Sequence, residues 1–380
     1  MPFAGGLRAA LPLCSQAMDI SRARTVLART PALDAVRLHD LLDAADGEPE
    51  RALGARATQR VKLPAAALRF LASPDEAAID ADLVWLVANG VHIVLADDAE
   101  YPPLLRQLAD APAALYVQGS VAALHSAQLA MVGSRSPTPS GRATAREFAA
   151  WFARAGLTVT SGLAVGIDAA SHEGALAGGG ETIAVYATGL DRVYPEEHAA
   201  LAQRIRTRGA LVSEFPPRTP PRREHFPRRN RLIAGLSLGT LVVEAARHSG
   251  SLITARLAAE AGREVFAIPG SIHSPLARGC HQLIKSGAKL VEEAADVLSE
   301  LNFSVGKEAV TAPLPEPQKP RELDKEYEML LDALGFEPAT IDILVARTHL
   351  PGESVASMLL ILELEGRVAA LPGGRYGRLP

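Results

Sequence analysis

Short apolar runs alternate with helical segments from Leu129 to Val291, and no other feature of the sequence constrains the fold as strongly. Each run has the length of a strand covered on both faces, and the segments between runs place apolar residues at helical spacing. Strands that alternate with helices form right-handed βαβ units, in which a parallel sheet carries helices on both faces. The predicted fold class is therefore α/β, with strands at 129–132, 157–160, 182–187, 210–213, 240–243, 264–268 and 289–291.

Four turns that follow these strands carry glycine together with hydroxyl groups. They are Gly133-Ser134-Arg135, Ser161-Gly162 with Gly166, Ser249-Gly250-Ser251, and Pro269-Gly270-Ser271. Open α/β sheets bind ligands beyond the carboxyl ends of their strands, and exposed backbone N–H groups there attract phosphate. We therefore expect the four turns to line one anion-binding crevice. The sequence has neither a GxGxxG fingerprint nor a Walker lysine, which disfavours a nicotinamide or ATP site, so we expect no cofactor.

An arginine-rich segment follows the fourth of these strands. Between Arg204 and Arg231 nine arginines stand against two glutamates, an excess of seven positive charges that the net charge of −4 conceals. Phosphate affinity depends on such a local patch and not on the total charge. Prolines stiffen the loop expected from Phe215 to Arg231, and Phe226 lies among its arginines. An aromatic ring in this setting either stacks on a base of a single strand or anchors the loop in the core. We interpret His225 as structural.

The flanking regions differ in composition and indicate separate domains. Residues 18–75 are rich in alanine and leucine and predict a helical domain, with Met18 a candidate start, while the sheet is assigned to 76–302. A proline-rich linker is expected at 303–321. Residues 322–380 contain three helical stretches and a glycine-turned hairpin, which is the pattern of a winged helix. No apolar run reaches the roughly 18 residues that span a bilayer, and two cysteines, Cys14 and Cys280, fit a reducing cytoplasm.

Several motifs of the central region occur in a specific order. They are 131–135, 161–168, 188–191 with Tyr194-Pro195, 225–235, 249–255 and 265–271. This set closely resembles the DNA-processing protein DprA (Smf) family. The resemblance implies a Rossmann-like domain, preceded by a helical domain similar to a sterile alpha motif (SAM) and followed by a winged helix. It further implies a cytoplasmic homodimer that binds single-stranded DNA and loads RecA recombinase during natural transformation, without catalytic residues or metal.

The resemblance also assigns DNA contacts to individual residues. The family's phosphate-binding arginine falls on Arg135, its basic residue before Phe-Pro on Arg223, where lysine is common, and its base-pocket phenylalanine on Phe226. Val165 departs from the family pattern, in which arginine is frequent. The predicted DNA-binding residues are Gly133, Ser134, Arg135, Ser161, Gly162, Gly166, Arg223, Phe226, Pro227, Arg229, Asn230, Arg231, Ser249, Gly250, Ser251, Thr254 and Gly270.

Two other functions were weighed against this one. The run from Gly239 to Glu244 is similar to the Gly-Thr-x-x-Glu element of nucleotide phosphoribohydrolases, but it has one residue too many, which turns a strand side chain to the other face. We interpret Asp168, Asp191 and Glu244 as turn or capping residues, because no local pair has the spacing of metal ligands. The second alternative is a transcriptional regulator that acts through the winged helix.

The winged helix itself could meet duplex DNA or a protein. Its expected recognition helix, Gly352 to Leu364, contains no arginine, whereas groove readers contact bases and phosphates through Arg, Asn, Gln and other polar groups. The residues leave both partners open.

Overall fold

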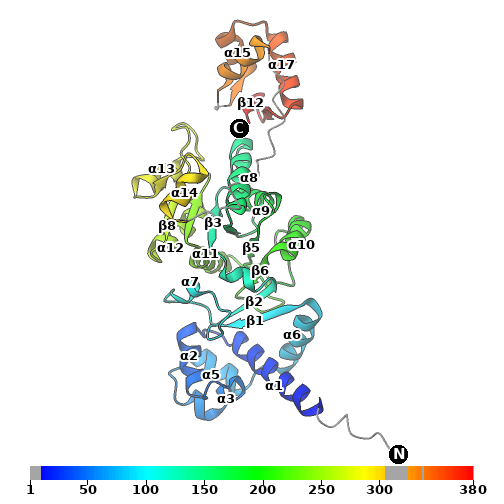
Figure 1. Cartoon of the computed structure of the whole chain (residues 1–380), viewed down its shortest axis with the longest axis vertical. Helices are drawn as coiled ribbons and strands as arrows, with labels where there is room; N and C mark the ends of the chain where they lie inside the picture. The colour runs from blue at the N-terminus through cyan, green and yellow to red at the C-terminus, as the bar shows by residue number, and fades with distance from the viewer. Residues whose placement is uncertain (1–9, 304–323, 336–337, 380) are drawn as a thin grey trace, which may run out of the picture.

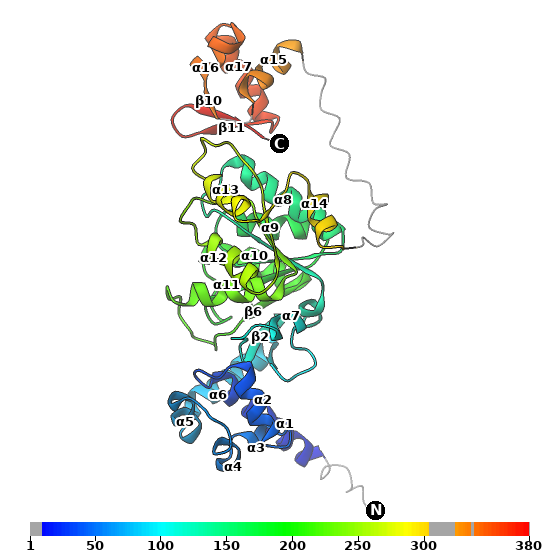
Figure 2. The same cartoon turned by 90° about the vertical axis from the view of Figure 1, so that its left-hand side faces the viewer.

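The computed structural model describes residues 10–303, 324–335 and 338–379, with side chains from residue 20 onward. A helical N-terminal region, a central sheet with its helices and a small C-terminal unit follow one another along the long axis of the molecule (Figures 1 and 2). The predicted linker at 303–321 falls almost entirely on residues that the structure does not describe, and so do the side chain of Cys14 and the first nine residues.

The central sheet has nine strands in the order β1-β2-β6-β5-β4-β3-β7-β8-β9 within the described residues. Its strands are β1 (Val91–Leu95), β2 (Ala114–Gly119), β3 (Gln128–Val132), β4 (Thr158–Ser161), β5 (Thr182–Val185), β6 (Ala210–Ser213), β7 (Gly239–Val242), β8 (Glu264–Ala267) and β9 (Lys289–Leu290). The strands β6-β5-β4-β3-β7-β8-β9 are parallel to one another. Leu129 of β3 lies opposite Val159 of β4 and Gly239 of β7. The predicted parallel α/β sheet is confirmed.

One edge of the sheet differs from the prediction. Strand β1 pairs antiparallel with β2, and β2 pairs antiparallel with β6. Only the single-turn helix α7 (Pro103–Arg106) lies between β1 and β2. A parallel pair needs a crossover of a dozen or more residues, usually a helix that packs on the sheet, whereas an antiparallel pair does not. The sheet is therefore mixed, with two antiparallel strands next to β6.

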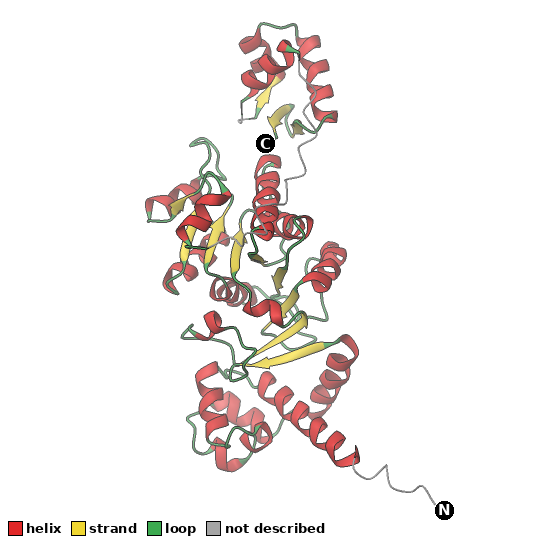
Figure 3. Ribbon diagram, in the orientation of Figure 1, coloured by secondary structure: helices red, strands yellow, loops and turns green. Residues whose placement is uncertain are grey.

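Helices cover both faces of the sheet, because successive strand side chains point to opposite sides. On one face α8 (Pro139–Arg154) and α9 (Ile167–Ala177) pack over Met131 and Val159, with α14 (Ala294–Glu300) beside them. The short η2 (Glu196–His198) leads into α10 (Ala199–Arg208), which packs on β5 and β6. On the other face α11 (His225–Leu236), α12 (Ser251–Glu260) and α13 (Arg278–Lys285) pack over Val132 and Val242. Figure 3 shows this layering.

The strand order reverses at β3. The chain moves from β3 to β4, β5 and β6 on one side, and α11 then returns it to β7 on the other side of β3. The connections after β3 and β7 thus leave the sheet in opposite directions. In open α/β sheets such a reversal is where a ligand crevice forms.

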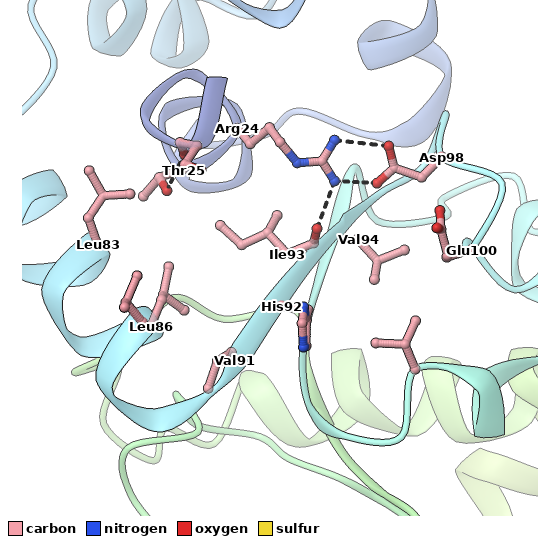
Figure 4. Close-up of a pocket in the computed structure, with 13 residues that line it drawn as sticks. Arg24, Thr25, Leu83, Leu86, Val91, His92, Ile93, Val94, Asp98 and Glu100 are labelled. Atoms are coloured by element: carbon pink, nitrogen blue, oxygen red, sulfur yellow. Dashed lines mark hydrogen bonds and ion pairs between the residues drawn. The ribbon is translucent and has the colours of Figure 1, made fainter. Parts of the chain in front are cut away.

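The N-terminal region consists of α1 (Ala10–Arg29), α2 (Ala35–Asp43), α3 (Pro49–Ala52), α4 (Ala55–Thr58), α5 (Ala65–Ala72) and α6 (Glu76–Asn89). Its buried leucines, Leu27 and Leu38 among them, share one core with Leu95 and Leu115 of β1 and β2. Between α1, α6 and β1 lies a cavity of about 540 Å³. There the Arg24 guanidinium pairs with Asp98 and donates to the Ile93 carbonyl oxygen at 2.7 Å (Figure 4). The helical region is therefore packed against the antiparallel edge of the sheet.

The C-terminal unit has the winged-helix arrangement that the sequence predicts. It contains α15 (Lys325–Leu334), α16 (Ile341–Thr348) and α17 (Gly352–Leu364), with β10 (Ala339–Thr340), β11 (Val368–Leu371) and β12 (Arg375–Arg378) in the order β10-β12-β11. Its core is separate and includes Leu330, Leu344 and Leu359. Gly373 and Gly374 both have positive φ, which a tight hairpin turn requires.

None of the helices that the structure describes combines the length and the apolar character needed to cross a membrane.

Candidate nucleic-acid interface

The first two predicted turns lie against each other beyond β3 and β4. The Ser134 N–H donates to the Glu244 carbonyl oxygen at 2.7 Å, and the Ser134 carbonyl oxygen accepts from the Ile167 N–H at 3.1 Å. Gly166 has a φ of +86°, and a Cβ there would overlap the Ser134 carbonyl oxygen. Only glycine fits this position, because any side chain would separate the turns. The structure therefore brings Gly133, Ser134, Arg135 and Gly166 together at the reversal point of the sheet.

Glu244, just after β7, fixes the start of α8. Its carboxylate accepts from the N–H and the hydroxyl of Thr138, at 2.9 and 2.7 Å, while the Thr138 hydroxyl oxygen accepts from the Gly141 N–H at 2.9 Å. Burial raises the pKa of the Glu244 carboxyl, and the hydrogen bonds from Thr138 oppose this rise. The interpretation of Glu244 as a fold-supporting residue is confirmed. Both carboxylate oxygens are already engaged, which does not favour the role of a hydrolytic glutamate.

Phe226 lies at the centre of a cluster of cationic and aromatic side chains. The guanidinium carbons of Arg135 and Arg229 are 5.5 and 5.9 Å from the centre of its ring. The ring of Tyr194 meets it edge to face at 5.9 Å. The Phe226 side chain is partly exposed and Arg135 is exposed. An aromatic face held between cations provides both a stacking surface and charge for a backbone phosphate.

The segment that carries Phe226 is not a loop throughout. Helix α11 begins at His225, four residues before Arg229, where the sequence pattern predicts that a helix starts. Pro227 occupies the first turn of this helix, where its missing N–H costs nothing and its fixed φ suits the helix. The His225 ring is buried, stacks on Phe215 with ring centres 4.2 Å apart and contacts the Ala187 carbonyl oxygen at 3.2 Å. The interpretation of His225 as structural is confirmed.

Arg229 points inward, toward the second turn. Its Nη1 lies 3.8 Å from Oδ2 of Asp168, which also accepts from the N–H groups of Gly162 and Ala164 at 3.1 and 3.3 Å. A Cβ on residue 162 would overlap Nη1, so Gly162 leaves the space that the guanidinium fills. Burial raises the pKa of the Asp168 carboxyl, and the charge of Arg229 opposes this rise. The Nε and Nη1 atoms of Arg229 have no hydrogen-bond partner among the described residues.

Several other arginines after β6 form ion pairs, either with Glu214 of the same segment or with acids from elsewhere in the fold. Arg231 and Arg228 both contact the buried Glu214, and Arg231 also contacts Asp110. Arg218 pairs with Asp82 of α6. Asp82, Asp110 and Asp168 add three negative charges to this segment and lower its positive excess from seven to four, which corrects the picture of an open arginine loop. Among the described residues Arg135 and Arg223 are exposed and form no ion pair, while Asn230 is partly exposed.

The third and fourth turns follow β7 and β8, on the other side of β3 from β4. The Ala245 N–H donates to the Leu276 carbonyl oxygen and the Gly279 N–H donates to that of Ala245, both at 2.7 Å. Ser249 and Ser251 share a hydrogen bond of 2.7 Å between their hydroxyls. Helix α12 begins at Ser251, and the side chains of Ser251 and Thr254 are buried. Ser251 and Thr254 therefore face the protein, whereas Gly250 and Gly270 are exposed.

Two contributors to this site were not on the predicted list. Tyr194, after β5, is 48% exposed although its ring touches Phe226. The sequence signal that could have identified Tyr194 is its place in the Tyr194-Pro195 motif, where an aromatic residue stands beside a proline. Asp82 gave none, because its partners Arg29 and Arg218 lie 53 and 136 residues away.

These observations define a class of protein, a Rossmann-like sheet with a cationic and aromatic cluster at its reversal point and a winged helix after it. The family model described as DNA recombination-mediator protein A matches residues 92–302, and the DprA winged helix domain matches 314–374. The chain belongs to this DprA (Smf) family.

Individual relatives agree with this assignment. Protein Smf of Escherichia coli K12 is 46% identical over 316 residues, which cover 82% of this chain and 84% of that protein. The crystal structure of DprA from Streptococcus pneumoniae superposes with a TM-score of 0.65 at 37% identity, over 75% of this chain and 99% of that one. A structure of DNA processing protein A from Helicobacter pylori, described for its single-stranded DNA binding mode, superposes with a TM-score of 0.51 at 28% identity. The match covers 56% of this chain and 95% of that one.

Proposed function

We propose that this chain binds single-stranded DNA across the crevice at the carboxyl ends of β3 and β4. The observation that carries the proposal is the exposed Arg135 guanidinium placed over the partly exposed ring of Phe226. The cation can bind a backbone phosphate while the neighbouring aromatic face stacks on an unpaired base. The single-stranded DNA binding described for the Helicobacter pylori relative supports the same substrate.

The chemistry of the crevice divides the strand between two kinds of contact. Arg135 and Arg223 hold phosphates, and the N–H groups of the glycine-rich turns add donors that carry no sequence preference. A base stacks on the partly exposed ring of Phe226, and the buried guanidinium of Arg229 supports that ring from 5.9 Å. Binding of this kind is independent of sequence, because phosphates and ring faces are common to every nucleotide.

We also propose that the bound strand is delivered to RecA recombinase during natural transformation in the cytoplasm. The family description, a recombination mediator, supports this role. A homodimer is proposed as well, and its support is the open edge of the sheet at β9, where Leu290 is 47% exposed. The division into domains at 18–75, 76–302, 303–321 and 322–380 is likewise a proposal, and the separate core of the winged helix supports the last of these domains.

Replacing Arg135 with alanine tests the phosphate contact. We expect weaker binding to oligothymidine of every length and a salt dependence of log K that is lower by about one unit, because each phosphate contact releases about one counterion. Fluorescence anisotropy at several salt concentrations measures both quantities. Arg223→Ala should behave in the same way. Arg51→Ala removes an exposed arginine of the N-terminal region and serves as the control. An unchanged slope in both crevice variants would contradict the proposal.

The winged helix is not expected to carry this binding. The exposed residues of α17 include Glu353, Leu360 and Leu364, and the helix has no cation to hold a phosphate. Deleting residues 322–380 should therefore leave affinity for oligothymidine within about twofold, since the crevice is complete without them. A transcriptional regulator would instead lose its DNA binding, and the same anisotropy titration with a duplex probe separates the two.

The enzyme alternative has a direct assay. A nucleotide phosphoribohydrolase would release free base from nucleoside monophosphates, whereas a binding protein releases none. Because Thr138 occupies both oxygens of Glu244, we expect no release above that of a Glu244→Gln variant.

A further inference from the structure

Asp82 of α6 connects the N-terminal helical region with the arginine-rich segment. Its side chain has no exposed surface and pairs with Nη1 of Arg29 from α1 and with Nη2 of Arg218, which follows β6. Nη2 of Arg218 also reaches the Ala78 carbonyl oxygen, at 3.3 Å. One buried carboxylate thus bridges two guanidinium groups from distant parts of the chain. The two ion pairs therefore hold α1, α6 and the segment after β6 in fixed relative positions.

The backbone around Arg218 is held equally firmly. Arg218 has a φ of +67°, a conformation that a residue other than glycine adopts only where its surroundings impose it. Its N–H donates to Asp191 at 2.6 Å. The next residue, Thr219, donates from its hydroxyl to the Pro216 carbonyl oxygen at 2.7 Å, and its carbonyl oxygen accepts from the Gly189 N–H at 3.1 Å. The turn at 216–219 is thus fixed by both side-chain and backbone contacts.

This turn lies directly before the proposed DNA-binding residues. Arg223 and Phe226 lie five and eight positions after Arg218. Pro220 and Pro221 lie between Arg218 and Arg223. Two prolines restrict the backbone and transmit the position of one end of a short segment to the other. Arg223 is exposed and forms no ion pair among the described residues, so its place depends on the turn before it and on α11 after it.

We propose that Arg218, clamped by Asp82, is a positioning residue for the segment 220–226, so that the N-terminal helical region sets the affinity of the crevice without contacting the strand. This inference rests on the proposed binding of single-stranded DNA. It assigns to α1 and α6 a function in recognition, in addition to their own packing.

The first test compares Arg218→Ala with Arg204→Ala in the full-length chain. Arg204 is an exposed arginine of α10 with no ion pair among the described residues, so its loss matches the change in charge. We expect amide hydrogen exchange in peptides covering 216–226 to rise only in Arg218→Ala. Affinity for oligothymidine should fall about fivefold, since ordering the segment then becomes part of binding. The salt slope should stay at the wild-type value, because no phosphate contact is lost.

Asp82→Asn separates positioning from direct contact by the sign of its effect. If Arg218 touched a phosphate, freeing it from Asp82 would raise affinity, and Arg218→Ala would lower the salt slope. The clamp predicts the opposite, an affinity as low as that of Arg218→Ala, with no further loss in the double variant. Arg218→Lys retains a cation for Asp82 and should retain most of the affinity. Thermal unfolding of each variant identifies any loss that comes from misfolding.

The exchange measurement keeps this inference independent of the proposed function. If the wild-type chain did not bind oligothymidine, the proposed function would fail, and the exchange contrast between Arg218→Ala and Arg204→Ala would still decide whether the clamp exists. If exchange at 216–226 were the same in Arg218→Ala and the wild type, the inference would be overturned even with single-stranded DNA binding intact.

Discussion

Phe226→Ala is expected to weaken binding to single-stranded DNA by about 1–3 kcal/mol, the range measured for removing one aromatic stacking platform. Since about 1.4 kcal/mol corresponds to a factor of ten, the dissociation constant should rise between about fivefold and 150-fold. The salt slope should not change, because the ring carries no charge. This combination distinguishes Phe226 from Arg135, whose loss changes affinity and slope together.

The same anisotropy titrations measure this prediction, with Phe226→Trp and Phe70→Ala as companions. Tryptophan preserves a stacking face and should retain binding, while Phe70 is a partly exposed aromatic of α5, remote in sequence from the crevice. If Phe226→Ala left affinity unchanged but lowered the unfolding temperature, the ring would be an anchor of α11, the other role that the sequence left open.

Gly162→Ala is expected to destabilise the fold and to weaken DNA binding at the same time. The new Cβ would overlap Nη1 of Arg229, which is buried and has little space to move. Displacing that guanidinium leaves Asp168 buried without its cation, a change that costs about 3–5 kcal/mol in comparable pairs. Arg229 would also lose its place within 5.9 Å of the Phe226 ring, so binding should weaken as well.

Thermal unfolding followed by circular dichroism measures the stability effect, and anisotropy measures binding. Gly352→Ala is the matched control, since a Cβ there meets only Val345, at the ordinary distance of 3.8 Å. A Gly162→Ala variant that melted with the wild type and bound DNA normally would show that Arg229 has another stable position, and the assigned role of the glycine would be wrong.

The local patterns of the sequence predicted much of the fold. The strands and helices between Leu129 and Leu290 lie where the apolar spacing placed them, within a few residues, because a covered strand and an amphipathic helix are set by neighbouring side chains. The glycine turns follow the strands for the same reason. The antiparallel edge was missed, since the pairing of β2 with β6 joins residues far apart in the chain.

The crevice was predicted in part. Arg135, Phe226 and the turns at Gly133 and Gly166 meet as expected, because strand order in a doubly wound sheet fixes where they emerge. The predicted conformation of residues 225–228 was wrong, because they are helical. A proline-rich and arginine-rich stretch resembles a loop, yet its second half is the first turns of α11, where tertiary contacts of Leu232 and Ile233 with the sheet outweigh local propensity.

By itself the sequence determined the layered α/β architecture and the place of the glycine turns after the strands, since these follow from short-range periodicity. Only the tertiary structure decided which cations remain available to a ligand. Arg218, Arg229 and Arg231 are neutralised by Asp82, Asp168 and Glu214. Arg135 and Arg223 are exposed without such partners among the described residues. The reason is that Coulomb attraction depends on distance in space, and the fold brings together charges separated by up to 136 residues of chain.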